Sequence, residues 1–194
     1  MHITLCWHDR LPVKGYGGTQ RVVVWLARGL VTLGHRVSLI AGSGSEVPGV
    51  SLVSVDPRVA RADSFDVTPL IPAGTDILHA HFPLRMTPDV PSVWTLHGNT
   101  RPGRVLPPNT IFVSGNHAAR HDSAAFIYNG IDPDEYIFQE NKEDYDFFIG
   151  TLHRRKGYQL AIEGARRTGR PLVLAGGWRP TIRRGIRFVG TVDG

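Results

Sequence analysis

The sequence predicts an α/β fold of two Rossmann-like domains, the second of which is incomplete. Short apolar segments alternate along the chain with segments of helical periodicity. A strand–helix–strand pattern occupies the first 42 residues, and a shorter pattern of the same kind follows Tyr145. Strands joined through a helix form a βαβ unit, which implies a parallel sheet.

The first domain is expected over residues 1–130. Its main helix is predicted at Thr19–Leu33 and ends at Gly34. The apolar residues at helical spacing, expected to be buried, are Val23, Leu26, Ala27, Leu30 and Val31. The predicted strands are His2–Trp7, Arg36–Ile40, Val50–Val55, Asp76–Ala80, Ser92–Leu96, Thr110–Val113 and Ala124–Tyr128. Asn99–Asn109, with three prolines, is predicted to be a loop.

The second domain is expected over residues 131–194. An acidic, turn-rich segment that begins at Asn129 is interpreted as the linker between the domains. The predicted elements are strands at Asp146–Gly150, Pro171–Ala175 and Ile186–Val189, and a helix at Lys156–Thr168. The residues of this helix that we expect to be buried are Leu160, Ala161, Ile162 and Ala165.

Charge and composition favour anionic partners in a reducing compartment. The 194 residues carry a formal net charge of +5 and a single cysteine, Cys6, which excludes an intrachain disulfide. We expect a cytoplasmic protein, since we see neither a signal peptide nor an apolar run of about 20 residues. The arginine-rich segment Arg179–Arg187 has no interleaved aromatic residues. It is therefore interpreted as a solvated loop, with peripheral membrane contact as an alternative and no nucleic acid expected.

Two glycines stand directly before the first helix. Gly17, Gly18 and Thr19 form a candidate anion site, since a helix N-terminus offers unpaired N–H groups and glycine allows close approach. Thr19 would either cap the helix or face a ligand. An ordinary turn with a cap is the alternative. A dinucleotide site is less well supported, since the pattern is not G-x-G-x-x-G and no acidic residue ends the next strand.

Three histidines follow or end predicted strands of the first domain. His97 ends a strand and precedes the proline-rich loop, which would place it in the crevice where open α/β sheets bind ligands. His79 and His81 alternate along another strand and so share a face. They could hold a metal, but no third ligand is evident nearby, and a structural role is preferred.

A basic segment separates the first strand and the helix of the second domain. Arg154, Arg155 and Lys156 concentrate positive charge next to a helix N-terminus, an arrangement suited to a diphosphate. A solvated basic loop is the alternative.

Taken together, several segments resemble the group 1, retaining (family four) glycosyltransferases of the GT-B fold. The segment KGYGGTQRVVVWLARGLVTLGHRVSLIAG resembles the first βαβ unit of that family. The segments DILHAHFP, VWTLHGN and FVSGNHAAR then follow in the family's order, with Asn116 where a second serine is usual. YNGID resembles the hinge, and IGTLHRRKGYQLAIEGARRTGRPLVLAGG resembles the start of the nucleotide-sugar (donor) domain. The resemblance covers nearly the whole chain.

This resemblance implies transfer of a hexose from a nucleotide-diphosphate sugar to a hydroxyl acceptor, with retention and without a metal. It assigns His97 to the acceptor pocket beside the reacting sugar. Gly17, Gly18 and Thr19 would approach the donor phosphate and the acceptor. Lys156 matches a lysine that binds the leaving diphosphate. The acceptor would be a glycan, a lipid or a small metabolite.

Two departures from the family leave alternatives open. Thr151 stands where the family has an arginine, a role that Arg154 or Arg155 would have to take. The family's glutamate pair E-x7-E, which binds the donor, has no counterpart that we can assign in this chain. The protein is therefore a glycosyltransferase, a truncated relative that binds a nucleotide or sugar without catalysis, or a scaffold without a ligand. Since the second domain is expected to be half-built, we also expect self-association or a completing chain.

Overall fold

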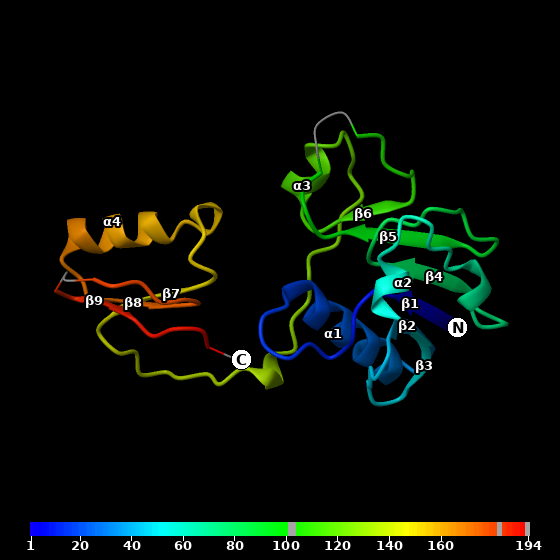
Figure 1. The fold of residues 1–194 in the computed structure, drawn as a ribbon, viewed down its shortest axis with the longest axis horizontal. Coiled ribbons are helices and arrows are strands. Elements are labelled where there is room, and N and C mark those ends of the chain that lie inside the picture. The colour runs from blue at the N-terminus through cyan, green and yellow to red at the C-terminus, as the bar shows by residue number, and fades with distance from the viewer. Residues whose placement is uncertain (101–103, 182–183, 193–194) are drawn as a thin grey trace. The chain divides into compact units, whose positions relative to one another are not determined.

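The structure, a computed structural model, describes residues 1–100, 104–181 and 184–192 and divides into two compact units (Figure 1). The first unit comprises Met1–Val13 and Gly17–Pro133, and the second comprises Asp134–Gly194 with Lys14–Tyr16. The division falls after Pro133, slightly beyond the boundary expected at residue 130.

The first unit is built on a six-stranded parallel sheet of order β3-β2-β1-β4-β5-β6. This is the strand order of the Rossmann fold, in which the order reverses between β1 and β4. The strands are β1 (His2–Cys6), β2 (Arg36–Gly42), β3 (Val50–Val55), β4 (Ile77–Ala80), β5 (Ser92–Leu96) and β6 (Thr110–Phe112). The helical segments are α1 (Gly18–Thr32), α2 (Pro57–Ala60), η1 (Thr68–Leu70) and α3 (Gly115–Ala119).

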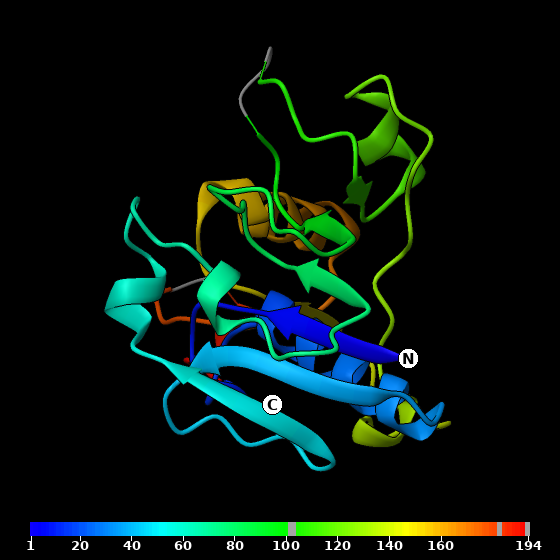
Figure 2. The same cartoon turned by 90° about the vertical axis from the view of Figure 1, so that its right-hand side faces the viewer.

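Both faces of this sheet are covered near its centre. Helix α1 packs on one face against residues that alternate along β1 and β2, among them Leu5 and Leu39. The intervening residues Cys6 and Ile40 face the other side, where α2 and the segment after it cover them. Figure 2 shows α1 behind the central strands. Because both faces are buried, nearly all residues of these two strands are buried, including the polar side chains of Thr4 and Ser38.

Helix α1 ends in a Schellman motif at Gly34. The N–H of His35 donates to the carbonyl of Leu30, and the N–H of Gly34 donates to that of Val31. Gly34 has a φ of 81°, in the left-handed region that favours glycine. Gly29, by contrast, lies within the helix, and a Cβ added there would meet nothing within 4 Å.

We therefore expect opposite effects from two glycine-to-alanine substitutions in this helix. Gly29→Ala should raise the free energy of unfolding of the first unit by about 1 kcal/mol, because alanine is the better helix former. Gly34→Ala should lower the free energy of unfolding by about 1 kcal/mol, because alanine disfavours the left-handed backbone conformation at this position. Urea denaturation of both variants tests this, and a shift of the same sign in both would contradict it.

The second unit is smaller and contains a three-stranded parallel sheet of order β7-β8-β9. Its strands are β7 (Asp146–Ile149), β8 (Leu172–Ala175) and β9 (Ile186–Phe188), and its helical segments are η2 (Pro133–Glu135), η3 (Arg154–Lys156) and α4 (Tyr158–Thr168). The unit is centred on the buried side chains Tyr158, Ala165, Leu172 and Leu174. Helix α4 thus covers one face of the sheet.

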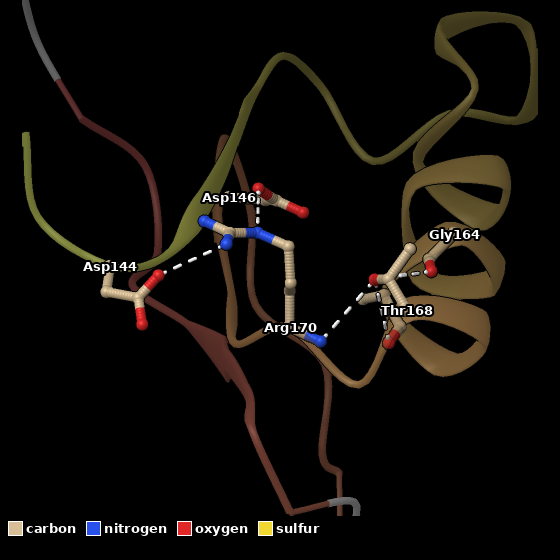
Figure 3. Close-up of polar contacts among 6 residues, drawn as sticks. Asp144, Asp146, Gly164, Thr168 and Arg170 are labelled. Atoms are coloured by element: carbon tan, nitrogen blue, oxygen red, sulfur yellow. Dashed lines mark hydrogen bonds and ion pairs between the residues drawn. The ribbon is translucent and has the colours of Figure 1, made fainter.

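Arg170 connects the start of β8 to the segment that leads into β7 (Figure 3). Its Nε donates to Asp146 Oδ1 at 2.9 Å, and its Nη1 lies 3.1 Å from Asp144 Oδ1. The two carboxylates raise the pKa of Arg170, chiefly through the hydrogen bond to Asp146. These contacts are exposed to solvent and contribute little to stability.

The sequence-based expectations differ from the structure at three places. Leu160 is 77 % exposed, since the buried positions of α4 follow Tyr158 at intervals of three, four and seven residues. The helix expected from Lys156 is interrupted by Gly157, whose φ of 79° separates η3 from α4. The strand expected at Ala124–Tyr128 is reduced to one bridge, between Phe112 and Phe126.

Parts of two expected loops lie outside the described residues: 101–103 of Asn99–Asn109, and 182–183 of Arg179–Arg187. In the described part of the chain, no helix is both long and apolar enough to cross a membrane.

Candidate functional site

A cavity of about 740 Å³ opens where β1, β4 and β5 end. This is the edge at which parallel α/β sheets bind ligands. Residues that follow these strands line it, together with the first turn of α1. They are Trp7, His8, Thr19, His81, Phe82, Pro83, Trp94, Thr95, Leu96, His97, Gly98, Asn99, Thr100 and Arg104.

The loop between β1 and α1 is held in place by Leu11. Its side chain is fully buried, and its N–H donates to Ser45 Oγ at 2.9 Å. The carbonyl of Leu11 accepts from the N–H of Glu46 at 2.8 Å. These bonds fix the chain that leads into α1, and so the position of Thr19 at the cavity.

The two glycines before α1 differ in their surroundings. Gly17 is the N-cap of the helix, and a Cβ there would lie 2.8 Å from Cγ1 of Val13. Gly18 begins the helix, and a Cβ there would meet nothing within 4 Å. The packing of the chain thus requires glycine at position 17 but not at position 18. Of the two roles open to Thr19, capping is excluded, because Thr19 lies inside the helix after the N-cap residue; it lines the cavity instead.

Four polar side chains form a connected row on the sheet face that carries α1. His79 Nε2 lies 2.7 Å from Thr95 Oγ1, and His81 Nδ1 lies 2.9 Å from His97 Nε2. The rings of His79 and His81 stack with their centroids 4.3 Å apart. We call these four residues the histidine row. It forms because alternate residues of a strand share a face and because β4 and β5 are neighbours.

The hydrogen bond between His81 and His97 restricts how the two rings carry their protons. Their other nitrogens, His81 Nε2 and His97 Nδ1, are buried and find no partner among the described residues. When both rings are neutral, one ring donates in the shared bond and the other accepts. The remaining two nitrogens are then always one N–H and one lone pair. Leaving such a buried atom unpaired costs about 1–3 kcal/mol, so these two nitrogens favour a hydrogen-bonding partner.

Burial keeps the histidine row uncharged. It lowers the pKa of His97 to about 4, and it lowers that of His79 to about 4 with a smaller contribution from His97. The pKa of His81 lies well below its usual value, first through burial and then through the other two rings. Near neutral pH all three rings are therefore hydrogen-bonding groups, and His97 does not carry the positive charge that its ordinary pKa would allow.

The rings of the histidine row are hydrogen-bonded within the row. Among the described residues, no group of three or more histidine, cysteine, aspartate or glutamate side chains is arranged to hold a metal ion. The ring nitrogens of His79 and His81 are instead directed to Thr95 and His97.

In the second unit, the predicted basic residues form one turn of 3-10 helix. Arg154, Arg155 and Lys156 are all exposed and compose η3. His153 caps this turn, accepting at Nδ1 from the N–H of Arg155 at 3.2 Å. No side chain caps the following helix α4, whose N-cap is Gly157. The segment therefore combines three cations with an uncapped helix N-terminus.

Thr19 and His97 are thus the predicted site residues that share one cavity of the first unit, and Gly17 and Gly18 do not line it. The sequence reasoning missed Thr95, His8 and Arg104. Thr95 alternates with His97 on the same strand, a signal that was present in the sequence. His8 lies two residues after the end of β1, another signal that the sequence offered.

Comparison with solved structures identifies the fold. AviGT4, "a glycosyltransferase involved in Avilamycin A biosynthesis", superposes with a TM-score of 0.72 at 27% sequence identity, over 100% of this chain and 65% of that chain. WaaG, "a glycosyltransferase involved in lipopolysaccharide biosynthesis", gives a TM-score of 0.57 at 15% identity, over 98% of this chain and 70% of that chain. The chain has the GT-B fold of the glycosyltransferases.

The GT-B fold assigns the two units as its two Rossmann-like domains. The chain spans about two thirds, 65%, of the length of AviGT4. No protein-family model and no curated protein matches the chain.

Proposed function

We propose that this protein is a glycosyltransferase that moves a hexose from a nucleotide-diphosphate sugar to a hydroxyl acceptor, with retention. The observation that carries the proposal is the match of the whole chain to AviGT4, a glycosyltransferase, together with a histidine-lined cavity at the ligand-binding edge of the sheet. AviGT4 is involved in Avilamycin A biosynthesis and WaaG in lipopolysaccharide biosynthesis. Both are consistent with a hydroxyl acceptor.

In this proposal the first unit holds the acceptor. The neutral ring of His97 lines the acceptor site, and its hydrogen bond with His81 fixes the orientation of that ring. Thr19 lies in the same cavity. His81 is a positioning residue and His97 the residue that contacts substrate.

The second unit binds the donor. Lys156, with Arg154 and Arg155, stabilises the diphosphate as it leaves and gains charge in the transition state. The N-terminus of α4, which no side chain caps, adds N–H groups of the same polarity. No metal is required in this scheme, because the side chains of Arg154, Arg155 and Lys156 neutralise the negative charge of the diphosphate.

The test is incubation with several nucleotide sugars and measurement of released nucleotide diphosphate. We expect release with one of them, and a decrease of about 100-fold for His97→Ala, in the range seen when one positioned acid, base or hydrogen-bonding group is removed. Lys156→Ala should weaken nucleotide binding about tenfold. Lys142→Ala, which removes an exposed lysine that lies over Phe138, is its control. Equal effects of both lysine changes would contradict the donor assignment.

A second candidate is a relative that binds nucleotide or sugar without transferring it. It is favoured by Thr151, which stands in place of the arginine of the resembling family. Nucleotide binding without release of nucleotide diphosphate from any donor would support this candidate over the enzyme.

A further inference from the structure

A second cavity adjoins the first one, between α2 and the segment that follows β4. Its volume is about 310 Å³. It is lined by His8, Ala60, Arg61, Ala62, Phe65, Phe82, Pro83, Arg85 and Arg104. We call it the arginine cavity. All of its lining residues belong to the first unit.

Aromatic rings give the arginine cavity a firm apolar wall. Phe65 is buried, and its ring centroid lies 6.2 Å from that of Phe82. Phe82 in turn meets the ring of His8 edge to face at 5.6 Å. Because these rings pack on one another, the polar side chains around them surround a space of defined shape.

The polar lining of this cavity is mainly cationic. Arg61 pairs with Asp9, and Arg85 pairs with Asp63. Asp63 is itself 93% exposed, so its pair with Arg85 is a surface contact that a bound anion can replace. Arg104 has no acidic partner within residues 1–100, 104–181 and 184–192. The three arginines of the lining are therefore balanced by two carboxylates, those of Asp9 and Asp63, which leaves an excess of positive charge.

The arginine cavity lies next to the cavity that contains His97. His8, Phe82, Pro83 and Arg104 line both. A molecule with its hydroxyl group near His97 could therefore extend past His8 towards the arginines. One guanidinium group can donate two parallel hydrogen bonds to two oxygens of a phosphate. Arginine is therefore well suited to bind a phosphate group.

We propose that the arginine cavity binds a phosphate group carried by the acceptor, remote from the hydroxyl that receives the sugar. This rests on the proposed function, which supplies the acceptor. Arg104 and Arg85 bind the phosphate, and Arg61, held by Asp9, completes the positive wall. The acceptor is then a phosphorylated alcohol rather than a neutral glycan.

The experiment is a titration of the whole protein with glycerol 3-phosphate, and with glycerol at equal concentrations, followed by the NMR resonances of the His8 imidazole. His8 is a local reporter, since it lines both cavities. We expect saturable shifts with glycerol 3-phosphate alone. Arg104→Gln and Arg85→Gln should each raise its Kd at least fivefold.

Arg58→Gln is the matched control. Arg58 lies in α2 close to Arg61, is exposed, and does not line the arginine cavity, but its loss changes the net charge by the same amount. A rise in Kd as large for Arg58→Gln as for Arg104→Gln would show general attraction by charge and overturn the proposal. Equal shifts with glycerol, or shifts that disappear in Lys156→Ala and persist in Arg104→Gln, would overturn it as well.

This binding measurement contains no nucleotide sugar, so it is independent of turnover. Binding that depends on Arg104, with no release of nucleotide diphosphate from any donor, would contradict the proposed enzyme and leave the phosphate site standing. Turnover that is unchanged by Arg104→Gln with a phosphorylated acceptor would contradict the phosphate site and leave the enzyme standing.

Discussion

Gly176→Ala is expected to destabilise the second unit by at least about 3 kcal/mol. A Cβ at this position would lie 2.1 Å from the carbonyl oxygen of Gly150 and 2.5 Å from its carbon. Both atoms belong to the backbone, so no side-chain rotation relieves the contact. The φ of 114° adds strain for any residue with a side chain.

The close contact lies where two strands of the small sheet end. The N–H of Gly150 donates to the carbonyl of Ala175 at 3.0 Å, and the N–H of Gly176 donates to that of Gly190 at 2.7 Å. An added methyl group would push the ends of β7 and β8 apart and break these bonds. The core of this unit is small and is centred on Tyr158, Ala165, Leu172 and Leu174, so little stability remains to offset the loss.

Amide hydrogen exchange along β8 measures the effect, since the amides of a destabilised sheet lose protection. Gly190→Ala is the matched control. Gly190 has a φ of 82°, but a Cβ there would meet nothing within 4 Å. It should cost about 1 kcal/mol, the effect of the backbone conformation alone. A Gly176→Ala variant no less protected than Gly190→Ala would contradict the steric argument.

The sequence predicted most of the fold because its strands are short segments rich in apolar and β-branched residues, separated by turn residues or a helical pattern. Val50–Val55 and Ser92–Leu96 were predicted with the bounds that the structure has. Leu160 was wrongly expected to be buried because the apolar residues of α4 fit more than one helix face. The structure buries the face that contains Tyr158, which was not among the residues expected to be buried.

The site was predictable only in part, since it depends on contacts between distant segments. Sequence spacing places His79 and His81 on one face, but their partners Thr95 and His97 follow from the adjacency of β4 and β5. Likewise, the adjacent glycines look equivalent in the sequence. Only the position of Val13 makes Gly17 necessary. The low pKa of His97 also has no sequence signal, because burial causes it.

Stability is expected to fall steeply between pH 6.5 and pH 4, because the histidine row must gain protons. Histidine has a pKa of about 6.5 in an unfolded chain. His79 and His97 have pKa values of about 4 in the folded protein. The unfolded state therefore binds protons first as the pH falls. The stabilising contribution is complete above pH 6.5, declines through this window, and reaches its minimum below pH 4.

His79 alone should cost about 2 kcal/mol between pH 7.5 and pH 5, and about 3 kcal/mol by pH 3. The contribution of His97 has the same sign and is smaller than its pKa suggests, since its ring is partly exposed at the cavity. Burial also lowers the pKa values of His8 and His117, which lie outside the row and add to the total. The difference between the unmodified protein and a variant that lacks one histidine is therefore more informative than the total loss of stability.

His79→Gln provides that comparison, because an amide can keep the hydrogen bond to Thr95 without titrating. Urea denaturation of both proteins at pH 7.5 and pH 5 should show a loss about 2 kcal/mol smaller in the variant. Carboxylates with ordinary pKa values do not titrate appreciably in this window. Parallel losses in the two proteins would mean that His79 binds a proton as readily in the folded protein as in the unfolded chain. The low pKa that burial gives His79 would then be wrong.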